Sequence, residues 1–320
     1  MGKVAIWGAS GAIGESVASA LRAQGTPYRV VGRSRASLER IFGSDPLAEI
    51  VTWDPEDAQS VRAAAAGIGT IVYTVGVDYW RFELHPQLIR ATLAGAIAEH
   101  VERFLLVATI YSYGRGVQAN PVREDHPREP HTFKGKMRLE QEEILLDADR
   151  AGKIKGAVLR LPDFYGPGVE KSFLDGLFNA AVSGKTANML GPIDVPHEFV
   201  YVPDVGPVIV RLIEEPQAYG RVLHLAGAGS TTQRAIVDRV EREVGHPVKI
   251  LVAGKTMLRM LGLFNPMMRE LADMHYLLAE PIIMDDSAIT ELIGPIQKTS
   301  YDDGVRQVLA SLREPSPVHA

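Results

Sequence analysis

The stretch KVAIWGASGAIGESVASALRA, residues 3–23, decides the fold. Residues 3–7 predict a short buried strand, and residues 12–23 predict a helix. Between them, Gly8 permits a tight turn, Gly11 lets the backbone approach a pyrophosphate, and Gly14 allows the helix to pack closely on the strand. The helix start offers free N–H groups and a partial positive charge to that anion. We therefore predict a pyrophosphate site formed by Gly8, Ser10, Gly11, Ala12, Ile13 and Gly14. The alternative is a purely structural glycine turn in another α/β protein.

Further short apolar runs alternate with helical patterns along the first two-thirds of the chain. The runs are typical of parallel strands covered on both faces. Predicted strands are 28–32, 49–52, 70–75, 103–109 and 157–161, and predicted helices include 55–66, 86–100 and 136–151. Repeated βα units with right-handed crossovers predict an α/β fold with a doubly wound parallel sheet of the Rossmann type.

The alternation of apolar runs and helical patterns becomes less regular after about residue 165. We expect residues 1–166 to form a dinucleotide-binding domain, with returns to the sheet near 200–210 and 222–229. Residues 167–199 and 230–320 are then expected to form a smaller substrate-binding lobe over the carboxyl edge of the sheet. The apolar, methionine-rich stretch 257–278 is interpreted as packing between the lobes, with a pocket wall or a dimer interface as alternatives.

The second predicted strand ends in Gly32-Arg33-Ser34-Arg35. A site that prefers NAD usually has an acidic residue at this tip, which binds both ribose hydroxyls. Here that acid is absent, and two guanidinium groups stand where a 2′-phosphate would lie. This tip therefore favours NADP(H) over NAD(H). Its residues are Arg33, Ser34 and Arg35. The alternative is that both arginines are merely solvated surface residues.

Taken together, these motifs resemble the extended short-chain dehydrogenase/reductase family of NAD(P)-dependent epimerases and dehydratases. The glycine spacing at 8–14 matches the family's cofactor loop, and HEFVYVPDVG (197–206) resembles a later motif. The resemblance implies that Asp54 contacts the adenine, although Asp54 also fits a helix cap with Pro55 at the first helical position. It implies that residues 74–76 and the segment RLPDFYGPG (160–168) line the cofactor. The residues so implied are Thr74, Val75, Gly76, Leu161, Pro162 and Phe164.

In that family a Tyr-x-x-x-Lys pair and a Ser or Thr perform the proton chemistry. Lys136 fits the family's lysine, which also holds the nicotinamide ribose, and Glu140 has the matching Lys-x-x-x-Glu spacing. Four residues before Lys136, however, stands Thr132, and the register of Lys134 gives Pro130. The family's tyrosine is missing in both registers, and a threonine hydroxyl is far less acidic than a phenol.

The segment ATIYSYG (108–114) offers a substitute. It resembles the family's Ser-x-x-x-Tyr-Gly strand end, which places Thr109 at the hydroxyl position. Tyr111 follows two residues later, on the same face of an extended strand. We hypothesise that Tyr111 donates the proton, that Lys136 tunes it and that Thr109 assists, with His131 as a weaker candidate acid. The alternative is that Tyr111 packs in the substrate pocket without a proton role.

Composition limits the remaining possibilities. The 320 residues contain no cysteine, which excludes disulfides, thiol nucleophiles and cysteine-based metal sites, and no cluster with metal-ligand spacing is evident. The formal charge of −5 carries no basic stripe for nucleic acid, and no apolar run reaches the length of a membrane span. The chain opens directly on a strand pattern, which leaves no signal peptide and predicts a cytoplasmic protein.

The sequence thus predicts an NADP(H)-dependent oxidoreductase, or an epimerase/dehydratase-like enzyme, acting on a small molecule without metal, nucleic acid or membrane. A homodimer is possible through helices 86–100 and 136–151. Reduction of a carbonyl, or of a conjugated carbon–carbon bond, is preferred over epimerisation because epimerisation in the family relies on the missing tyrosine. The rival interpretation is a non-catalytic NADP(H)-binding sensor, which would keep the glycine loop and lose the acid.

Overall fold

A computed structural model describes residues 2–115, 120–170 and 172–313. At its centre lies a seven-stranded sheet in which every pairing is parallel. The strand order is β10-β6-β5-β4-β1-β2-β3. The strands are β1 (Lys3–Trp7), β2 (Tyr28–Gly32), β3 (Ala48–Thr52), β4 (Ile68–Tyr73), β5 (Arg103–Thr109), β6 (Lys155–Leu161) and β10 (Val222–His224). The chain order reverses between β1 and β4, and this switch point opens a crevice at the carboxyl ends of the strands. The predicted doubly wound parallel sheet of the Rossmann type is confirmed.

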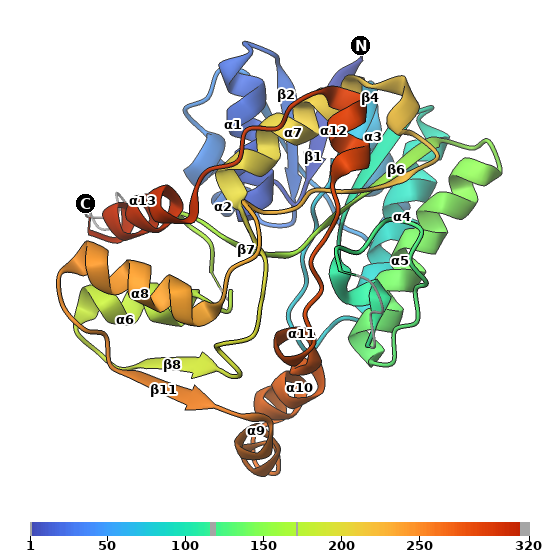
Figure 1. Cartoon of the computed structure of the whole chain (residues 1–320). Coiled ribbons are helices and arrows are strands. Elements are labelled where there is room, and N and C mark those ends of the chain that lie inside the picture. The colour runs from blue at the N-terminus through green and yellow to red at the C-terminus, as the bar shows by residue number, and fades with distance from the viewer. Residues whose placement is uncertain (1, 116–119, 171, 314–320) are drawn as a thin grey trace.

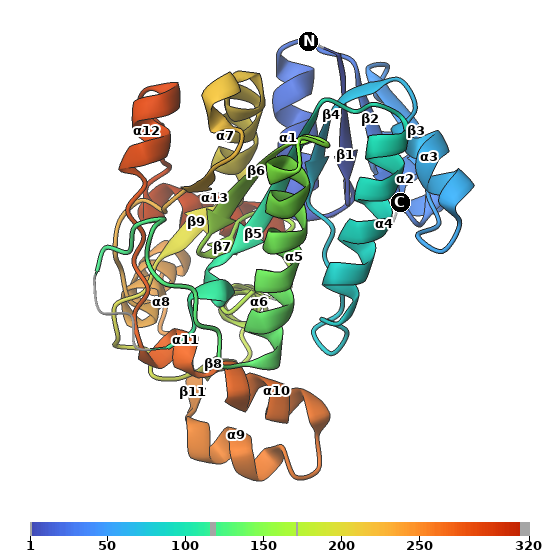
Figure 2. The ribbon, with the colours of Figure 1, turned by 90° about the vertical axis from the view of Figure 1, so that its right-hand side faces the viewer.

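Helices cover both faces of the sheet (Figures 1 and 2). Along β1 the side chains alternate, so that Val4 and Ile6 join one buried cluster while Ala5 and Trp7 join the other. The first face is covered by α1 (Ala12–Ala23), α2 (Arg35–Phe42), α7 (Val202–Glu214) and α12 (Ser287–Ile293). The second face is covered by α3 (Ala58–Ala65), α4 (Leu84–Ala98) and α5 (Phe133–Arg150).

A smaller group of elements lies beyond the carboxyl ends of the strands (Figure 1). Its own buried cluster is built by α6 (Asp175–Ser183), α8 (Gln233–Val244), α13 (Tyr301–Arg313) and the parallel pair β8 (Ala187–Leu190) and β11 (Ile250–Ala253). A second parallel pair, β7 (Asp163–Tyr165) and β9 (Phe199–Tyr201), connects this group to the sheet. The remaining elements are the 3₁₀ turns η1 (Ile110–Tyr113) and η2 (Pro216–Ala218) and the helices α9 (Lys255–Leu261), α10 (Pro266–Met274) and α11 (Tyr276–Ala279).

Two sequence-based assignments of local structure are wrong. The return to the sheet expected near 200–210 does not occur: β9 ends at Tyr201 and pairs with β7 outside the central sheet, and the chain continues as α7 with Pro203 in its first turn. Proline is favoured there because the first helical N–H groups need no partner. Helix α3 begins at Ala58, and its cap is Asp57, whose carboxylate accepts from the amide of Gln59 at 2.8 Å. Asp54 is therefore not the helix cap. It accepts from the amide of Glu56 at 3.0 Å and forms the preceding turn.

The methionine-rich stretch divides into buried and exposed parts. Met274 is buried with Tyr113 and Tyr276 in a cluster next to η1, which agrees with the packing interpretation. Met257 and Met260 are exposed on α9. A single interpretation of the stretch therefore does not hold, because its first half lies at the surface and its second half in the interior.

Candidate functional site

The glycine loop has the geometry of an anion site. Gly8 has φ of +81°, in the left-handed region that a side chain would strain. A Cβ on Gly14 would lie 2.6 Å from the carbonyl oxygen of Gly8, so only glycine lets α1 begin this close to the strand end. Helix α1 begins after Gly11 without any side-chain cap, and Ser10 and Gly11 are exposed. The first amides of α1 are therefore available to a negatively charged group.

The end of β4 supports this loop from the side. The Thr74 hydroxyl donates to the carbonyl oxygens of Trp7 at 2.8 Å and of Gly8 at 3.2 Å. A Cβ on Gly8 would lie 2.8 Å from the amide nitrogen of Val75, which shows how closely the two segments meet. Gly76 follows with open space around it. Residues 74–76 thus lie along the loop, where the sequence places them.

The tip of β2 presents one unpaired guanidinium. Arg33 is exposed and has no hydrogen-bond or ion-pair partner among the residues that the structure describes. Arg35 instead pairs with Glu39 at 3.3 Å across one turn of α2, and Ser34 caps that helix by accepting from the amide of Ser37 at 3.2 Å. Asp54 is exposed near the end of the neighbouring strand β3. Of the predicted tip residues, Arg33 is the one free to meet an anion.

The end of β5 differs from the expectation. The strand stops at Thr109, whose hydroxyl accepts from the amide of Tyr111 at 3.3 Å, and the chain then turns into η1. Tyr111 therefore does not lie on the same face of an extended strand as Thr109, and that geometric argument is wrong. The side chain of Tyr111 stacks on Phe82, with ring centroids 6.3 Å apart. It joins the partly buried aromatic edge of the cluster around Tyr276.

Tyr79, Tyr111 and Tyr276 lie close together beside the end of β5, a place we call the tyrosine corner. Burial raises the pKa of Tyr111 well above its ordinary value, and the neighbouring Tyr79, Asp163 and Tyr276 raise it further. Burial also raises the pKa of Tyr79, whose buried hydroxyl has no hydrogen-bond partner in the described residues. Burial raises the pKa of Tyr276 to about 12, against the lowering effect of the Thr132 hydroxyl. All three phenols therefore stay protonated at neutral pH and can donate hydrogen bonds.

Thr132 occupies the position of the missing tyrosine but has a structural task. It is the cap of α5, and its hydroxyl accepts from the amide of Gly135 at 3.1 Å. Only 8% of the residue is exposed. Because this hydroxyl is engaged by the helix start, the phenols of neighbouring segments are the more suitable proton donors at this corner.

The lysine that reaches the tyrosines is Lys134. Its side chain is 3% exposed, forms an ion pair with Glu270, and places its nitrogen 4.3 Å from the ring centroid of Tyr79. Burial lowers the pKa of Lys134 to about 8, with the charge of Asp273 opposing that shift. Lys136 lies two residues further along α5, which turns it away from this face, and it is exposed. The structure thus does not bring Lys136 to Tyr111, as the sequence-based hypothesis requires.

An aspartate and a histidine that sequence reasoning missed lie close to the same corner. The Nε2 atom of His197 is 2.8 Å from a carboxylate oxygen of Asp163, and both side chains are largely buried. The register of β7 and β9 sets Asp163 opposite Phe199, so His197, two residues before β9, lies close to Asp163. Each residue lies in a quoted motif, but nothing in either motif indicates that β7 and β9 pair.

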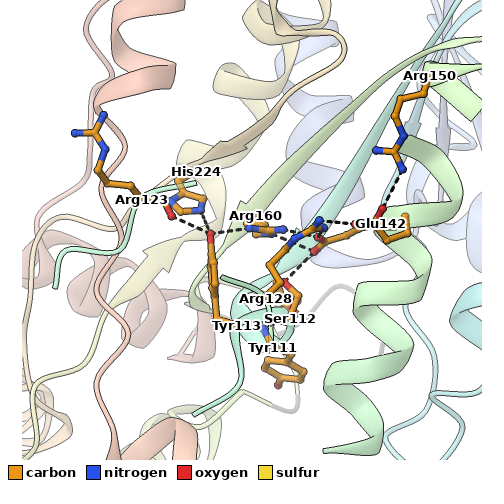
Figure 3. Close-up of polar contacts among 11 residues, drawn as sticks. Tyr111, Ser112, Tyr113, Arg123, Arg128, Glu142, Arg150, Arg160 and His224 are labelled. Carbon is orange, nitrogen blue, oxygen red and sulfur yellow. Dashed lines mark hydrogen bonds and ion pairs between the residues drawn. The ribbon is translucent and has the colours of Figure 1, made fainter. Parts of the chain in front are cut away.

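A buried ion pair holds η1 in place (Figure 3). Arg160 on β6 donates to both carboxylate oxygens of Glu142 on α5, at 2.6 and 3.2 Å, and both side chains are fully buried. Arg160 also donates to the hydroxyl of Tyr113 at 2.6 Å, and Ser112 donates to Glu142 at 3.3 Å. Ser112 and Tyr113 directly follow Tyr111 in η1. The pair therefore fixes the backbone from which Tyr111 projects.

The histidine at the far end of this network is neutral. The Nε2 atom of His224 is 2.5 Å from the hydroxyl of Tyr113, and its Nδ1 is 3.1 Å from the carbonyl oxygen of Asp285. Burial, together with the charge of Arg160, lowers the pKa of His224 to about 3. The carbonyl requires the proton on Nδ1, so the Tyr113 hydroxyl donates to Nε2. The side chains of Arg160, Tyr113 and His224 then each have a hydrogen-bond partner of the right kind.

Comparison with known proteins identifies the family. A sequence model of the NAD dependent epimerase/dehydratase family matches residues 4–233. The chain belongs to the NAD dependent epimerase/dehydratase family. A curated relative is the dTDP-6-deoxy-L-talose 4-dehydrogenase (NAD(P)(+)) of Kitasatospora kifunensis, 27% identical over 267 residues, which are 78% of this chain and 81% of that protein.

Two solved structures show the same fold. The dTDP-glucose 4,6-dehydratase DesIV of Streptomyces venezuelae, a double mutant with NAD and DAU bound, superposes with a TM-score of 0.81 at 19% identity, covering 98% of this chain and 97% of that one. The UDP-N-acetylglucosamine 4-epimerase of Bacillus cereus gives 0.78 at 15% identity, with 99% of each chain covered. By the family model, the chain is an enzyme of an epimerase/dehydratase family that depends on a nicotinamide dinucleotide.

The residues of this NAD dependent epimerase/dehydratase fit such a dinucleotide. The uncapped start of α1 suits the pyrophosphate, and the open space at Gly76 leaves room along the crevice. Leu161 and Pro162 are buried at the end of β6. Phe164 packs against the buried cluster on the first face of the sheet. No observation on these residues conflicts with the cofactor roles that the sequence assigns to them, which remain predictions.

A cavity of about 450 Å³ opens next to the tyrosines. Thr132, Lys134 and Tyr276 contribute to its inner wall, and His131 packs edge-on against Tyr276 with ring centroids 4.6 Å apart. The remaining lining residues are Arg115, Phe133, Lys255, Arg259, Glu270, Ala272, Asp273 and Met274. A volume of this size holds a small molecule, and its lining mixes apolar surface with cationic and acidic groups.

Proposed function

We propose that this family member is an NADP(H)-dependent oxidoreductase that acts on a carbonyl, or on a carbon–carbon bond conjugated to one, in a small molecule. The observation that carries the proposal is the gathering of three phenols and the Asp163–His197 pair beside the end of β5, while Thr132 caps a helix. When bound, the nicotinamide ring supplies or accepts a hydride. The chain must then bind the substrate oxygen and move one proton.

Tyr111 is the proposed proton donor, and the hydroxyl of Thr109 is proposed to orient the substrate oxygen. The raised pKa of Tyr111 keeps its proton in place until an oxygen of growing negative charge accepts it. The positive charge of Lys134, close to Tyr79, favours negative charge at this corner. Asp163 and His197, whose Nε2 atom lies 2.8 Å from the Asp163 carboxylate, form the nearby pair proposed to return a proton to the phenol. Lys136 keeps a proposed role at the nicotinamide ribose only.

Replacing Tyr111 with phenylalanine tests this assignment. We expect turnover to fall about 100-fold or more, because positioned general acids contribute roughly that much, while NADPH affinity stays unchanged. Oxidation of NADPH is followed by fluorescence over a panel of aldehydes, ketones, enones and nucleotide sugars. Tyr79→Phe and Tyr276→Phe are the matched controls, since both remove a hydroxyl from the same corner. Retained turnover with unchanged pH dependence in Tyr111→Phe would remove Tyr111 from the mechanism.

Arg33 is the proposed partner of the 2′-phosphate. Because Arg33 is unpaired, Arg33→Ala should lower NADPH affinity by about 10- to 100-fold, the value of one or two charge-assisted hydrogen bonds, and leave NADH affinity unchanged. Arg35→Ala should change NADPH affinity less, since Arg35 is held by Glu39. Both affinities are measured by titration of dinucleotide fluorescence. An equal loss for NADPH and NADH would show that Arg33 does not read the 2′-phosphate.

A sensor that binds NADP(H) without turnover is the second candidate. The structural role of Thr132 favours it, because the family's acid position then has no proton function. Binding of NADPH without its oxidation across the whole substrate panel would support the sensor over the oxidoreductase.

A further inference from the structure

Helices α9 and α10 form a hairpin that projects from the body of the molecule (Figures 1 and 2). Its turn carries a run of exposed apolar side chains, which we call the hairpin tip. Phe264 is 91% exposed and Leu263 is 73% exposed, the two highest values among the large apolar residues described. Met260 and Leu261 complete the tip at 60% and 43%. Large apolar groups in this arrangement mark an interaction surface.

The backbone groups around the turn of the hairpin form hydrogen bonds within the hairpin itself. The amide of Phe264 donates to the carbonyl of Leu261 at 3.1 Å, and Asn265 caps α10 by accepting from the amide of Met267 at 2.9 Å. Arg269 donates to the carbonyl of Gly262 at 3.3 Å and ties the two helices together. A segment with its own hydrogen bonds closed can leave water without exposing backbone groups.

The end of the hairpin that carries the tip is basic. Residues 254–269 contain Lys255, Arg259 and Arg269 and no acidic residue, whereas the acidic residues of α10, Glu270 and Asp273, follow nearer the body of the molecule, where Glu270 pairs with Lys134. Arg259 and Arg269 are exposed beside the tip, and Arg259 has no charged partner among the residues described. Basic residues next to exposed apolar side chains are the pattern of a helix that lies in the interface of an anionic membrane.

We propose that the hairpin tip docks on an anionic lipid bilayer and holds the enzyme at the membrane surface. A second copy of the chain fits this surface less well. Two tips would bring Arg259 and Arg269 of one copy close to the same residues of the other, and a narrow two-helix turn offers little of the roughly 800 Å² per partner that a stable dimer needs. Across the described residues no helix is long and apolar enough to cross a membrane, so the contact proposed is interfacial. The proposal is independent of the reaction under Proposed function.

The test is co-sedimentation of the full chain with vesicles. The probes are phosphatidylcholine alone and phosphatidylcholine with about one-third phosphatidylglycerol. We expect binding to the anionic vesicles that weakens as salt rises, and at least about tenfold weaker binding to the neutral ones, since surface charges are screened by salt. No sedimentation with anionic vesicles, or equal sedimentation with both kinds, would overturn the proposal.

Variants of the tip locate the contact. The double variant Leu263→Asp with Phe264→Asp should bind anionic vesicles roughly 100-fold less, because two apolar side chains no longer enter the lipid. Leu312→Asp is the matched control, since Leu312 is an exposed leucine on α13, well away from the hairpin (Figure 1). Unchanged thermal unfolding shows that the variant is folded. If the double variant instead converts a dimer to a monomer in sedimentation velocity and binds vesicles normally, the tip is a self-association surface and the proposal fails.

Discussion

Replacing Gly11 with valine is expected to weaken binding of NADPH by roughly 100-fold or more while leaving the fold intact. Gly11 has φ of −90° and ψ of 158°, an extended conformation that any residue adopts. A Cβ there would lie 3.4 Å from the carbonyl oxygen of Gly8, which is ordinary van der Waals contact. The added methyl groups would project toward the exposed start of α1, where the pyrophosphate is proposed to bind. The loss would therefore come from exclusion of the anion.

The matched control for this variant is Gly254→Val. Gly254 also precedes a helix with an ordinary φ of −83°, and a Cβ there meets nothing within 4 Å. We expect both variants to unfold within a few degrees of the wild type and only Gly11→Val to lose NADPH binding in a fluorescence titration. Undiminished NADPH affinity in a folded Gly11→Val protein would show that the dinucleotide binds elsewhere.

The largest expected effect on stability comes from the buried ion pair. Replacing Glu142 with glutamine leaves the fully buried Arg160 guanidinium without its charged partner, and Arg128, 3.5 Å from Glu142, loses one of its two partners. Burial alone would lower the pKa of Arg160, but Glu142 and Tyr113 raise it above its ordinary value, so the arginine stays charged. Removing one partner of such a pair costs about 3–5 kcal/mol of unfolding free energy. Denaturant unfolding of the wild type and the variant measures this difference.

Glu143→Gln provides the matched control, because Glu143 is the next residue on α5 and its pairs with Arg128 and Arg150 are partly exposed to solvent. Ion pairs that reach solvent contribute about 1 kcal/mol or less. The double variant Glu142→Leu with Arg160→Met should recover much of the lost stability, since apolar replacement of both partners removes the unpaired charge. A Glu142→Gln protein as stable as Glu143→Gln would show that the network does not anchor η1.

The parts of the molecule that were predictable are those encoded by local sequence. The glycine spacing between β1 and α1 fixes a strand, a turn and a helix within 23 residues, and the order of βα units then determines the parallel sheet. The position of Arg33 was predictable because it directly follows the last residue of β2, Gly32. In each case the signal and the structure lie within one short segment.

The candidate acid–base corner was less predictable because its members come from distant segments. Asp163 and His197 meet only because β7 pairs with β9, and Tyr276 arrives from a helix far along the chain. Lys134 and Lys136 have the same chemistry, and only the phase of α5, which begins at Phe133, decides which of them faces the tyrosines. The turn at η1 was not predictable from the sequence, because Ile110 and Tyr111 are of residue types that are common in strands.

The division into a dinucleotide-binding part and a substrate-binding lobe, the homodimer and the cytoplasmic location remain predictions. So does the preference for NADP(H), since solved relatives such as DesIV contain NAD. The family assignment and the parallel sheet do not depend on any of them.

Calorimetric titration of the intact chain with NADPH and with NADH tests the central claim most directly. Our account predicts that the amides at the start of α1 bind one dinucleotide per chain and that NADPH binds more tightly than NADH. Absence of binding heat with both dinucleotides, at several temperatures so that a zero binding enthalpy is not mistaken for no binding, would contradict it.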